Sequence, residues 1–501
     1  MLRKTLLTTL GLALTSGVAC AQDNIAQSGS SWFTDAQAEL QARIDHQPNT
    51  NRAKNVILFI ADGMGVGTNY AIRLYAGQQE GQYGSEHVLP YEAYGDFPNV
   101  ALVKTYNINA QTPDSAPTAG SMNTGVKQVF NTINLSDKAI HDDCASEAGN
   151  KLTLFSELMS DAGKSVGVVS TARLTHATPA AAFAKTANRN WEGEAPEGCT
   201  DIAAQLLEQM KAGVVDLAMG GGRRYFLPAD ATDDEGKKGR RKDARNLIDE
   251  AKEAGMQYAW NTETAGGLNL DGETPVLALF EDSHMKYEHD RTDADEPSLT
   301  DMTKMAIDYL SKNEDGYYLE IESGRVDHAN HDGNAFRTVT DGVEFARAVA
   351  AAAQMTNAED TLIIVTADHE HSIALNGYCG RGSPILGLCY EVAKGQVEHA
   401  AEPVLGDDGK PFTVIGFLNG PGAVLKKAEG GNDYSGSRPE LTEEEASDPE
   451  YIQQALIPMS SESHSGEDVA VWARGPWAHL FDGVIEQNYI FHVMNHAANA
   501  E

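Results

Sequence analysis

Residue types that bind metal ions occur in four short clusters spread over the chain. The clusters are residues 61–63, 113–116, 322–331 and 368–369, and a late histidine, His464, follows them. Hard cations bind carboxylate and hydroxyl oxygens, and zinc also binds imidazole nitrogen. Each cluster alone is a weak signal, but together they predict a hydrolytic site that holds three metal ions.

Two of the clusters directly follow runs of apolar residues. Asp62 comes after the run 56–60, and Asp368 and His369 come after the run 362–366. In an α/β protein, ligands bind beyond the carboxyl ends of the strands. Asp62 alone would more often be a turn or helix-capping residue, but the repeated arrangement favours metal binding.

Ser115 stands beside Asp114 and before a stretch, 116–127, that could begin a helix. Serine at such a position is often only a helix cap. The functional alternative is a nucleophile whose alkoxide is stabilised by a metal and by backbone N–H groups. No Gly-x-Ser-x-Gly motif surrounds Ser115, so a Ser-His-Asp hydrolase is not supported, and a metal would have to activate the hydroxyl.

The segment 322–331 combines acidic and histidine side chains after another strand-like run. Asp327 and His331 are four residues apart, so on a helix they face the same way and can share a cation. Glu322 ends the strand and could bind a different cation. His328 is expected to point elsewhere and to lie behind the ligands.

Four further residues have an ordinary structural interpretation when taken singly. His464 and His176 lie in loops, Thr178 follows His176, and Arg189 would by itself be a surface arginine. Their place in a site depends on the resemblance described below.

The elements that would position these side chains form an alternating pattern. Apolar, β-rich runs buried on both faces alternate with helix-like segments such as 152–162 and 336–354, which predicts a doubly wound α/β fold with a mostly parallel sheet and helices on both faces. The predicted strands are 55–60, 100–103, 165–170, 214–219, 317–321, 361–366 and 469–473. Two stretches break the pattern: 228–267 is charged and helical in places, and 376–460 resembles an inserted subdomain rather than sheet.

The chain of 501 residues is strongly acidic, with 73 acidic and 38 basic side chains and a net charge of −35. Such a surface repels nucleic acid and anionic membranes, so neither is an expected partner. Two explanations remain, a solvated surface adapted to high salt and a metal-storage surface. The acids are dispersed through loops rather than grouped in blocks, which favours the first.

The N-terminus has the pattern of a cleaved export signal. Arg3 and Lys4 precede the apolar run 6–18, and residues 19–21 form a small-residue cleavage site, so residues 1–21 are predicted to be removed and the protein to be periplasmic or secreted. Lipidation of Cys20 is the alternative. No later segment is apolar enough to cross a membrane.

Four cysteines remain after cleavage, an even number that predicts two disulfides in an oxidising compartment. Cys379 and Cys389 are joined by a glycine-rich loop flexible enough to close. The other two cysteines are Cys144 and Cys199.

With these motifs side by side, the chain resembles the alkaline phosphatase family, and its animal type more than its enteric bacterial type. The resemblance spans about residues 51–498. The motifs that carry it are residues 56–65, 113–116 with 124–127, 175–179, 219–223, 322–328, 366–369 and 464–471.

The resemblance implies a role for each candidate residue. It implies one zinc held by Asp327, His331 and His464, a second held by Asp62, Asp368 and His369 with Ser115 at its open position, and a magnesium held by Asp62, Thr178 and Glu322. Arg189 would clamp phosphate, and His176 and His328 stand where the enteric type has aspartate and lysine. The resemblance also implies a Cys144–Cys199 disulfide, a homodimer, and a catalytic domain of residues 22–375 and 461–501 interrupted by a crown-like subdomain, 376–460.

The implied activity is hydrolysis of phosphate monoesters through a phosphoserine intermediate. A phosphodiesterase or sulfatase of the same superfamily is the enzymatic alternative, although the stretch 115–118 lacks the arginine that a sulfatase nucleophile motif contains. A non-catalytic, acidic metal-binding surface protein is the alternative from another class.

Overall fold

The computed structural model describes residues 25–233, 235–429, 431 and 433–500, so the predicted export signal, residues 1–21 with Cys20, lies outside the described part. The chain divides into two compact units, residues 1–47 and 48–501. The first contains α1 (Ser31–Asp45), a helix with no buried residue. All the candidate site residues lie in the second unit.

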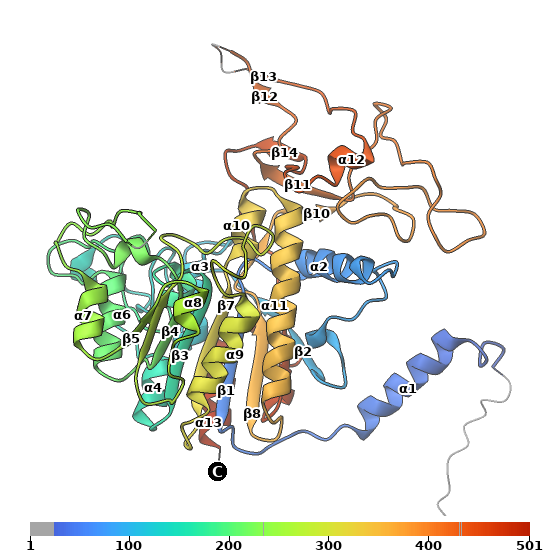
Figure 1. The fold of residues 1–501 in the computed structure, drawn as a ribbon. Helices are drawn as coiled ribbons and strands as arrows, with labels where there is room; N and C mark the ends of the chain where they lie inside the picture. The colour runs from blue at the N-terminus through green and yellow to red at the C-terminus, as the bar shows by residue number, and fades with distance from the viewer. Residues whose placement is uncertain (1–24, 234, 430, 432, 501) are drawn as a thin grey trace, which may run out of the picture. The chain divides into compact units, whose positions relative to one another are not determined.

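The second unit is built on a ten-stranded sheet in the order β17-β2-β16-β8-β1-β7-β3-β4-β6-β5 (Figure 1). Neighbouring strands are parallel except for β16, which runs antiparallel to both β2 and β8. The strands are β1 (Asn55–Ala61), β2 (Asn99–Lys104), β3 (Ser165–Arg173), β4 (Leu217–Gly221), β5 (Gln257–Ala259), β6 (Val276–Leu279), β7 (Tyr317–Ser323), β8 (Thr361–Thr366), β16 (Val469–Arg474) and β17 (Val484–Glu486). The prediction of a mostly parallel α/β sheet is confirmed.

Helices cover both faces of this sheet. On one face α9 (Leu299–Leu310) and α11 (Ala335–Met355) pack on each other and on the central strands, and on the other α3 (Ser115–Thr124), α4 (Phe155–Asp161) and α13 (Tyr489–Asn499) do the same. The remaining helices are α2 (Val66–Gln79), α5 (Ala177–Ala180), α6 (Ile202–Lys211), α7 (Leu247–Glu253), α8 (Thr262–Ala265), α10 (Arg325–His331) and α12 (Glu443–Ala446), with short 3₁₀ turns η1 (Pro90–Glu92), η2 (Cys144–Glu147), η3 (Arg223–Tyr225) and η4 (Ala478–Leu480).

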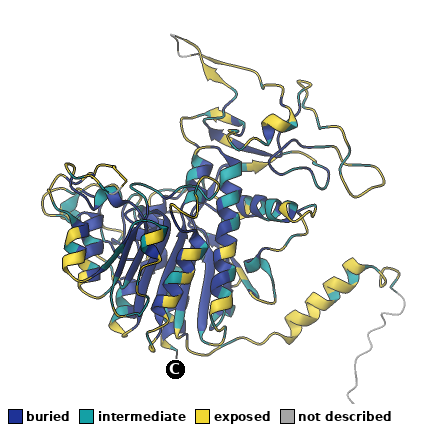
Figure 2. Ribbon diagram, viewed as in Figure 1, coloured by how far each residue is buried: buried dark blue, intermediate teal, exposed yellow. Residues whose placement is uncertain are grey.

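The central strands are buried along their whole length (Figure 2). Strand β8, Thr361–Thr366, is buried at every position, and β1 at every position after Asn55. Covering both faces removes the alternation of polar residues seen in half-exposed strands. This is why the apolar runs in the sequence located the strands well.

Two predictions about irregular stretches were wrong in part. The stretch 228–267 contributes β5 to the edge of the main sheet, where it pairs with β6. The stretch 376–460 also contains strands: β11 (Ile415–Gly420) pairs with β10 (Ile373–Leu375) and β14 (Ala455–Pro458), and β12 (Lys426–Lys427) pairs with β13 (Tyr434–Ser435). Edge and two-residue strands are too short to leave a periodic signal.

Both disulfides are present. Cys144 is bonded to Cys199 and Cys379 to Cys389, with Cα–Cα distances of 5.9 and 4.9 Å. The predicted connectivity is confirmed. Among the residues that the structure describes, no helix is both long enough and apolar enough to span a bilayer.

Candidate metal centre

Three adjacent parallel strands bring three carboxylates together at the carboxyl ends of the strands. β1 lies between β7 and β8, with Ile60 in register with both Glu322 and Thr366. Asp62 therefore follows β1 beside Glu322 on β7 and Asp368 just after β8. All three are completely buried.

The turn after β1 depends on a glycine. Gly63 has φ +72°, and a Cβ on it would lie 2.4 Å from the His371 ring, so no side chain fits there. The Gly63 N–H donates to Asp368 Oδ1 at 3.1 Å, which ties the two strand ends together.

The first group that could hold a metal consists of Asp62, Asp368 and His369. His369 Nε2 lies 3.3 Å from an oxygen of each carboxylate and 3.0 Å from Ser115 Oγ. Ser115 is the first residue of α3 and is buried. Ser115, the candidate nucleophile, therefore lies beside this group.

The second group consists of Asp62, Glu322 and His176. Thr178 adds a hydroxyl, since its Oγ1 lies 3.5 Å from Asp62 Oδ2. Ser170, on β3, donates to Glu322. Asp62 therefore belongs to two groups at once.

The third group consists of Asp327, His331, His371 and His464. Asp327 and His331 lie one turn apart on α10, and His331 Nε2 is 3.3 Å from Asp327 Oδ1. His464 lies in β15 (His464–Ser465), which pairs with β9 (Glu370–His371). The His464 Nε2 atom is 3.3 Å from Asp327 Oδ1.

The histidines of the third group are oriented as metal ligands are. His331 Nδ1 lies 2.6 Å from the Glu462 carbonyl, and His464 Nδ1 lies 2.9 Å from the Pro113 carbonyl. Each Nδ1–H can donate to its carbonyl, which leaves Nε2 with a lone pair facing Asp327. Metal-binding histidines are commonly fixed in this way.

Sequence reasoning missed His371, which sits between two carboxylates. Its Nε2 is 2.8 Å from Asp327 Oδ1 and its Nδ1 is 2.5 Å from Glu462 Oε2. Burial opposes protonation of His371, but Glu462 and Asp327 raise its pKa well above the usual value. Both ring nitrogens of His371 thus contact carboxylates, which makes it a partner of Asp327 and Glu462 rather than a fourth ligand. Its position two residues after His369 was the available signal.

The buried carboxylates need a cation to remain ionised together. Burial, followed by repulsion from Asp327, raises the pKa of Asp62 to about 8. Burial, followed by Asp62, raises the pKa of Asp368 to about 7 and that of Glu322 well above its ordinary value. Asp62 Oδ1 and Glu322 Oε1 also have no hydrogen-bond partner among the described residues. These unpartnered oxygens fit divalent cations.

Arg189 lies beside the segment of Ser115, the candidate nucleophile, and not on an open surface. It forms an ion pair with Asp114, the residue before Ser115, and its Nη2 is 3.0 Å from His176 Nε2. Sequence reasoning noted Asp114 only as part of a motif and did not predict this pair. The contacts with Asp114 and His176 therefore hold the Arg189 guanidinium in one orientation.

His328 packs beside His176, which belongs to the second group, and beside a third histidine that was not predicted, His284. The His328 ring centroid is 4.0 Å from that of His284 and 5.3 Å from that of His176. Burial, and then Arg325, lowers the pKa of His328 to about 3. The cluster is therefore neutral imidazole.

The fold and these three groups define an α/β enzyme with a metal-binding centre at the carboxyl edge of its sheet. The sequence profile described as alkaline phosphatase matches residues 53–500. The chain is 41% identical to an alkaline phosphatase of Gadus morhua over 484 residues, which covers 93% of this chain and 96% of that one. It is also 41% identical to the tissue-nonspecific isozyme of Gallus gallus, over 93% of this chain and 89% of the relative.

Solved structures agree on the fold. The alkaline phosphatase of Thermus thermophilus superposes with a TM-score of 0.63 at 21% identity, covering 92% of this chain and 94% of that one. That of the Antarctic bacterium TAB5 gives 0.60 at 21% identity, covering 90% and 100%. This chain belongs to the alkaline phosphatase family.

Proposed function

We propose that this enzyme hydrolyses phosphate monoesters through a phosphoserine intermediate on Ser115, assisted by two zinc ions and one magnesium ion. The observation that carries the proposal is the position of Ser115 Oγ, 3.0 Å from His369 Nε2 in a group that also contains Asp62 and Asp368. A hydroxyl beside a cluster of metal-ligand types has the surroundings that a nucleophile needs.

The ligand groups suggest an assignment of the metals. Asp327, His331 and His464 would hold one zinc, and Asp62, Asp368 and His369 the second. Asp62, Thr178 and Glu322 offer only oxygen, which suits magnesium. When bound, these ions supply the positive charge that favours an ionised Ser115 hydroxyl and stabilises a developing oxyanion.

Side-chain and backbone groups of the protein position the phosphate group. Arg189, held by Asp114, presents a planar fork that can bind two phosphate oxygens. Ser115 begins α3, so the N–H groups of Ser115 and Ala116 have no partner within the helix and can face the same anion. The Ser115 oxygen attacks phosphorus, the leaving alkoxide departs and gains a proton, and water then hydrolyses the phosphoserine.

The first prediction tests the nucleophile. Ser115→Ala should abolish an acid-stable phosphoenzyme while folding and metal content stay near wild type, because the change removes one hydroxyl from a turn held by other contacts. The phosphoenzyme is measured after quenching with labelled substrate. A variant that still forms it at the wild-type level would exclude Ser115. Slow residual turnover by a direct path would not.

The competing activities are separated by substrate and by chelation. p-Nitrophenyl phosphate should be turned over much faster than bis-p-nitrophenyl phosphate or p-nitrophenyl sulfate, and a chelator should abolish that turnover. Preference for the diester or the sulfate would favour another member of the superfamily, and no turnover would favour a binding protein.

We also propose the organisation that the resemblance implies: export through residues 1–21, a catalytic domain of residues 22–375 and 461–501, a crown-like insertion of residues 376–460, and a homodimer. The two disulfides support export to an oxidising compartment. N-terminal sequencing and light scattering of the secreted protein test the first and last of these.

A further inference from the structure

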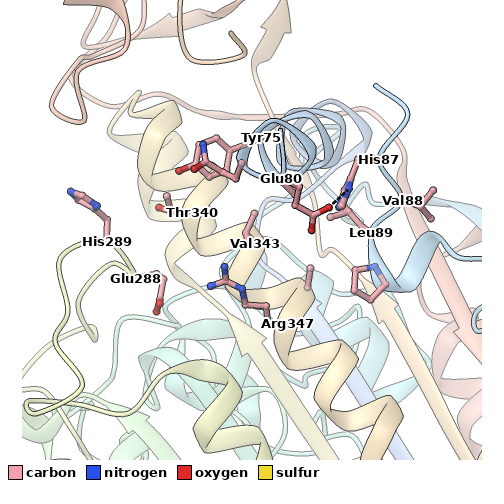
Figure 3. Close-up of a pocket in the computed structure, with 14 residues that line it drawn as sticks. Tyr75, Glu80, His87, Val88, Leu89, Glu288, His289, Thr340, Val343 and Arg347 are labelled. Atoms are coloured by element: carbon pink, nitrogen blue, oxygen red, sulfur yellow. Dashed lines mark ion pairs between the residues drawn. The ribbon is translucent and has the colours of Figure 1, made fainter. Parts of the chain in front are cut away.

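Two cavities outside the metal centre have charged side chains in their walls. One, of about 490 Å³, lies between α2, α11 and the loop with Glu288 (Figure 3), and two of its lining side chains, Glu80 and His87, lie 3.5 Å apart. The second, of about 600 Å³, is lined by Asn190 and Trp191, the two residues after Arg189, and by Tyr225. The second cavity therefore shares a loop with the candidate phosphate clamp.

The loop 239–243 presents two cations to this second cavity. Arg241 is buried and forms two hydrogen bonds with Asp201, at 2.8 and 2.9 Å. Alternate side chains of an extended segment point to opposite sides. Anchoring Arg241 inward thus turns its neighbours, Arg240 and Lys242, outward, where both line the cavity.

The opposite wall contains Tyr225, which packs against the loop that follows Arg189. A Cβ on Gly193 would lie 2.7 Å from Tyr225 Cδ1, so the backbone there rests directly on the tyrosine ring. The Arg173 guanidinium carbon lies 5.8 Å from the same ring centroid, and Arg173 is paired with Glu192. The cavity is therefore a built feature beside the centre.

Several hydrogen-bond donors in the cavity are available to a ligand. Within the described ranges, no side-chain hydrogen bond or ion pair involves the Arg240 guanidinium, the Asn190 amide or the Tyr225 hydroxyl. Lys242 is 2.7 Å from Glu194, but both side chains are mostly exposed, so opening this pair costs little. These donors all suit an anion.

We propose that this cavity binds a second anionic group, carried on the leaving group of a phosphate monoester. The inference rests on the proposed function and adds a substrate class to it, compounds with a second phosphate several atoms from the one transferred. On a chain with a net charge of −35, two outward cations next to the clamp loop would offset the repulsion of a highly charged substrate.

The test compares hexanediol monophosphate with hexanediol bisphosphate at fixed ionic strength. The bisphosphate has two reactive ends, which alone would make its KM half that of the monophosphate. In the wild type, its KM should be lower than that of the monophosphate by more than this factor of two. The double variant Arg240→Gln/Lys242→Gln should raise that KM about tenfold and leave KM for the monophosphate unchanged, since each exposed pair contributes up to about fivefold.

The matched control is Lys237→Gln/Lys238→Gln, which removes the same charge from the residues just before this loop, outside the cavity. An equal rise in this control would show that long-range charge alone is responsible, and no rise in either double variant would show that the cavity binds nothing. Either result overturns the inference. If the wild type does not turn over p-nitrophenyl phosphate, the proposed function itself fails.

Discussion

Asp62 is the residue on which the centre depends most, because it is common to two of the three ligand groups. One of its oxygens faces His369, and the other faces Thr178. Burial and repulsion from Asp327 raise its pKa to about 8, although Arg189 and His371 oppose this rise. A single carboxylate shared by two cations would couple their binding.

The second prediction follows from this sharing. Asp62→Asn should lose about two equivalents of metal, because an amide cannot supply the negative charge that both cations need, whereas Glu322→Gln should lose about one. Metal analysis after gel filtration measures both. Glu320→Gln is the matched control, a buried glutamate two residues earlier on β7 that bonds to Asn123 and Tyr318 instead.

Full metal retention in Asp62→Asn, or equal losses in all three variants, would contradict the shared ligand. The first result would mean that the two groups act separately. The second would mean that any polar change in this layer disrupts the fold.

At the scale of elements, the strands that carry the ligands were the easiest to predict. β8 was predicted with its observed bounds, and β1 and β7 within two residues, because burial on both faces makes them uniformly apolar. β5 has three residues at the sheet edge, and such an element depends on the neighbour it pairs with rather than on its own pattern.

Local sequence could not reveal partners that meet only through packing. Glu462 and His284 reach the site on segments far from the ligand motifs, and no spacing in the chain relates them to those motifs. The ligands themselves were predictable because they follow predicted strands or belong to recognised motifs. The partners that orient them are set by the antiparallel pairing of β9 with β15 and by the loops.

The third prediction concerns α11, which carries a buried aspartate. Burial raises the pKa of Asp341 to about 8, against a partial opposing effect of Arg325. The unfolded carboxyl ionises near pH 4, so the folded state holds the extra proton between about pH 4 and pH 8, and stability falls as pH rises through that window.

Asp341→Asn should remove this fall. Relative to wild type, the free energy of unfolding of the variant should rise by on the order of 4 kcal/mol from about pH 5 to about pH 8. The amide oxygen that the substitution introduces can still accept the hydrogen bond that Asp341 Oδ2 accepts from the Glu288 N–H. Denaturant unfolding at both pH values measures the difference, and a constant difference would show that Asp341 is ionised in the folded protein.

At the scale of the whole molecule, charge is the dominant property. The chain carries 73 acidic and 38 basic side chains, and removal of the predicted export signal, with Arg3 and Lys4, would take the net charge from −35 to −37. Many of the basic side chains are already paired, as Arg337 is with Asp290 and Glu450. The unpaired acidic side chains therefore repel one another across the surface. This repulsion is stronger in the compact folded state than in the unfolded chain, so it destabilises the fold.

The fourth prediction is that the protein needs salt for stability more than for catalysis. Salt screens exposed charges over a Debye length of roughly 10 Å at 0.1 M and roughly 3 Å at 1 M, whereas the carboxylates of the metal centre are buried and should be screened much less. Tm should rise substantially from low to molar NaCl, with much of the rise also in KCl because screening is not ion-specific. Zinc and magnesium are kept at fixed concentrations so that metal binding does not shift Tm. Under these conditions kcat should stay nearly constant while Tm rises. A Tm that stays flat from about 0.05 M to about 2 M salt would instead describe an ordinary acidic secreted enzyme, whose charges are dispersed enough to be harmless.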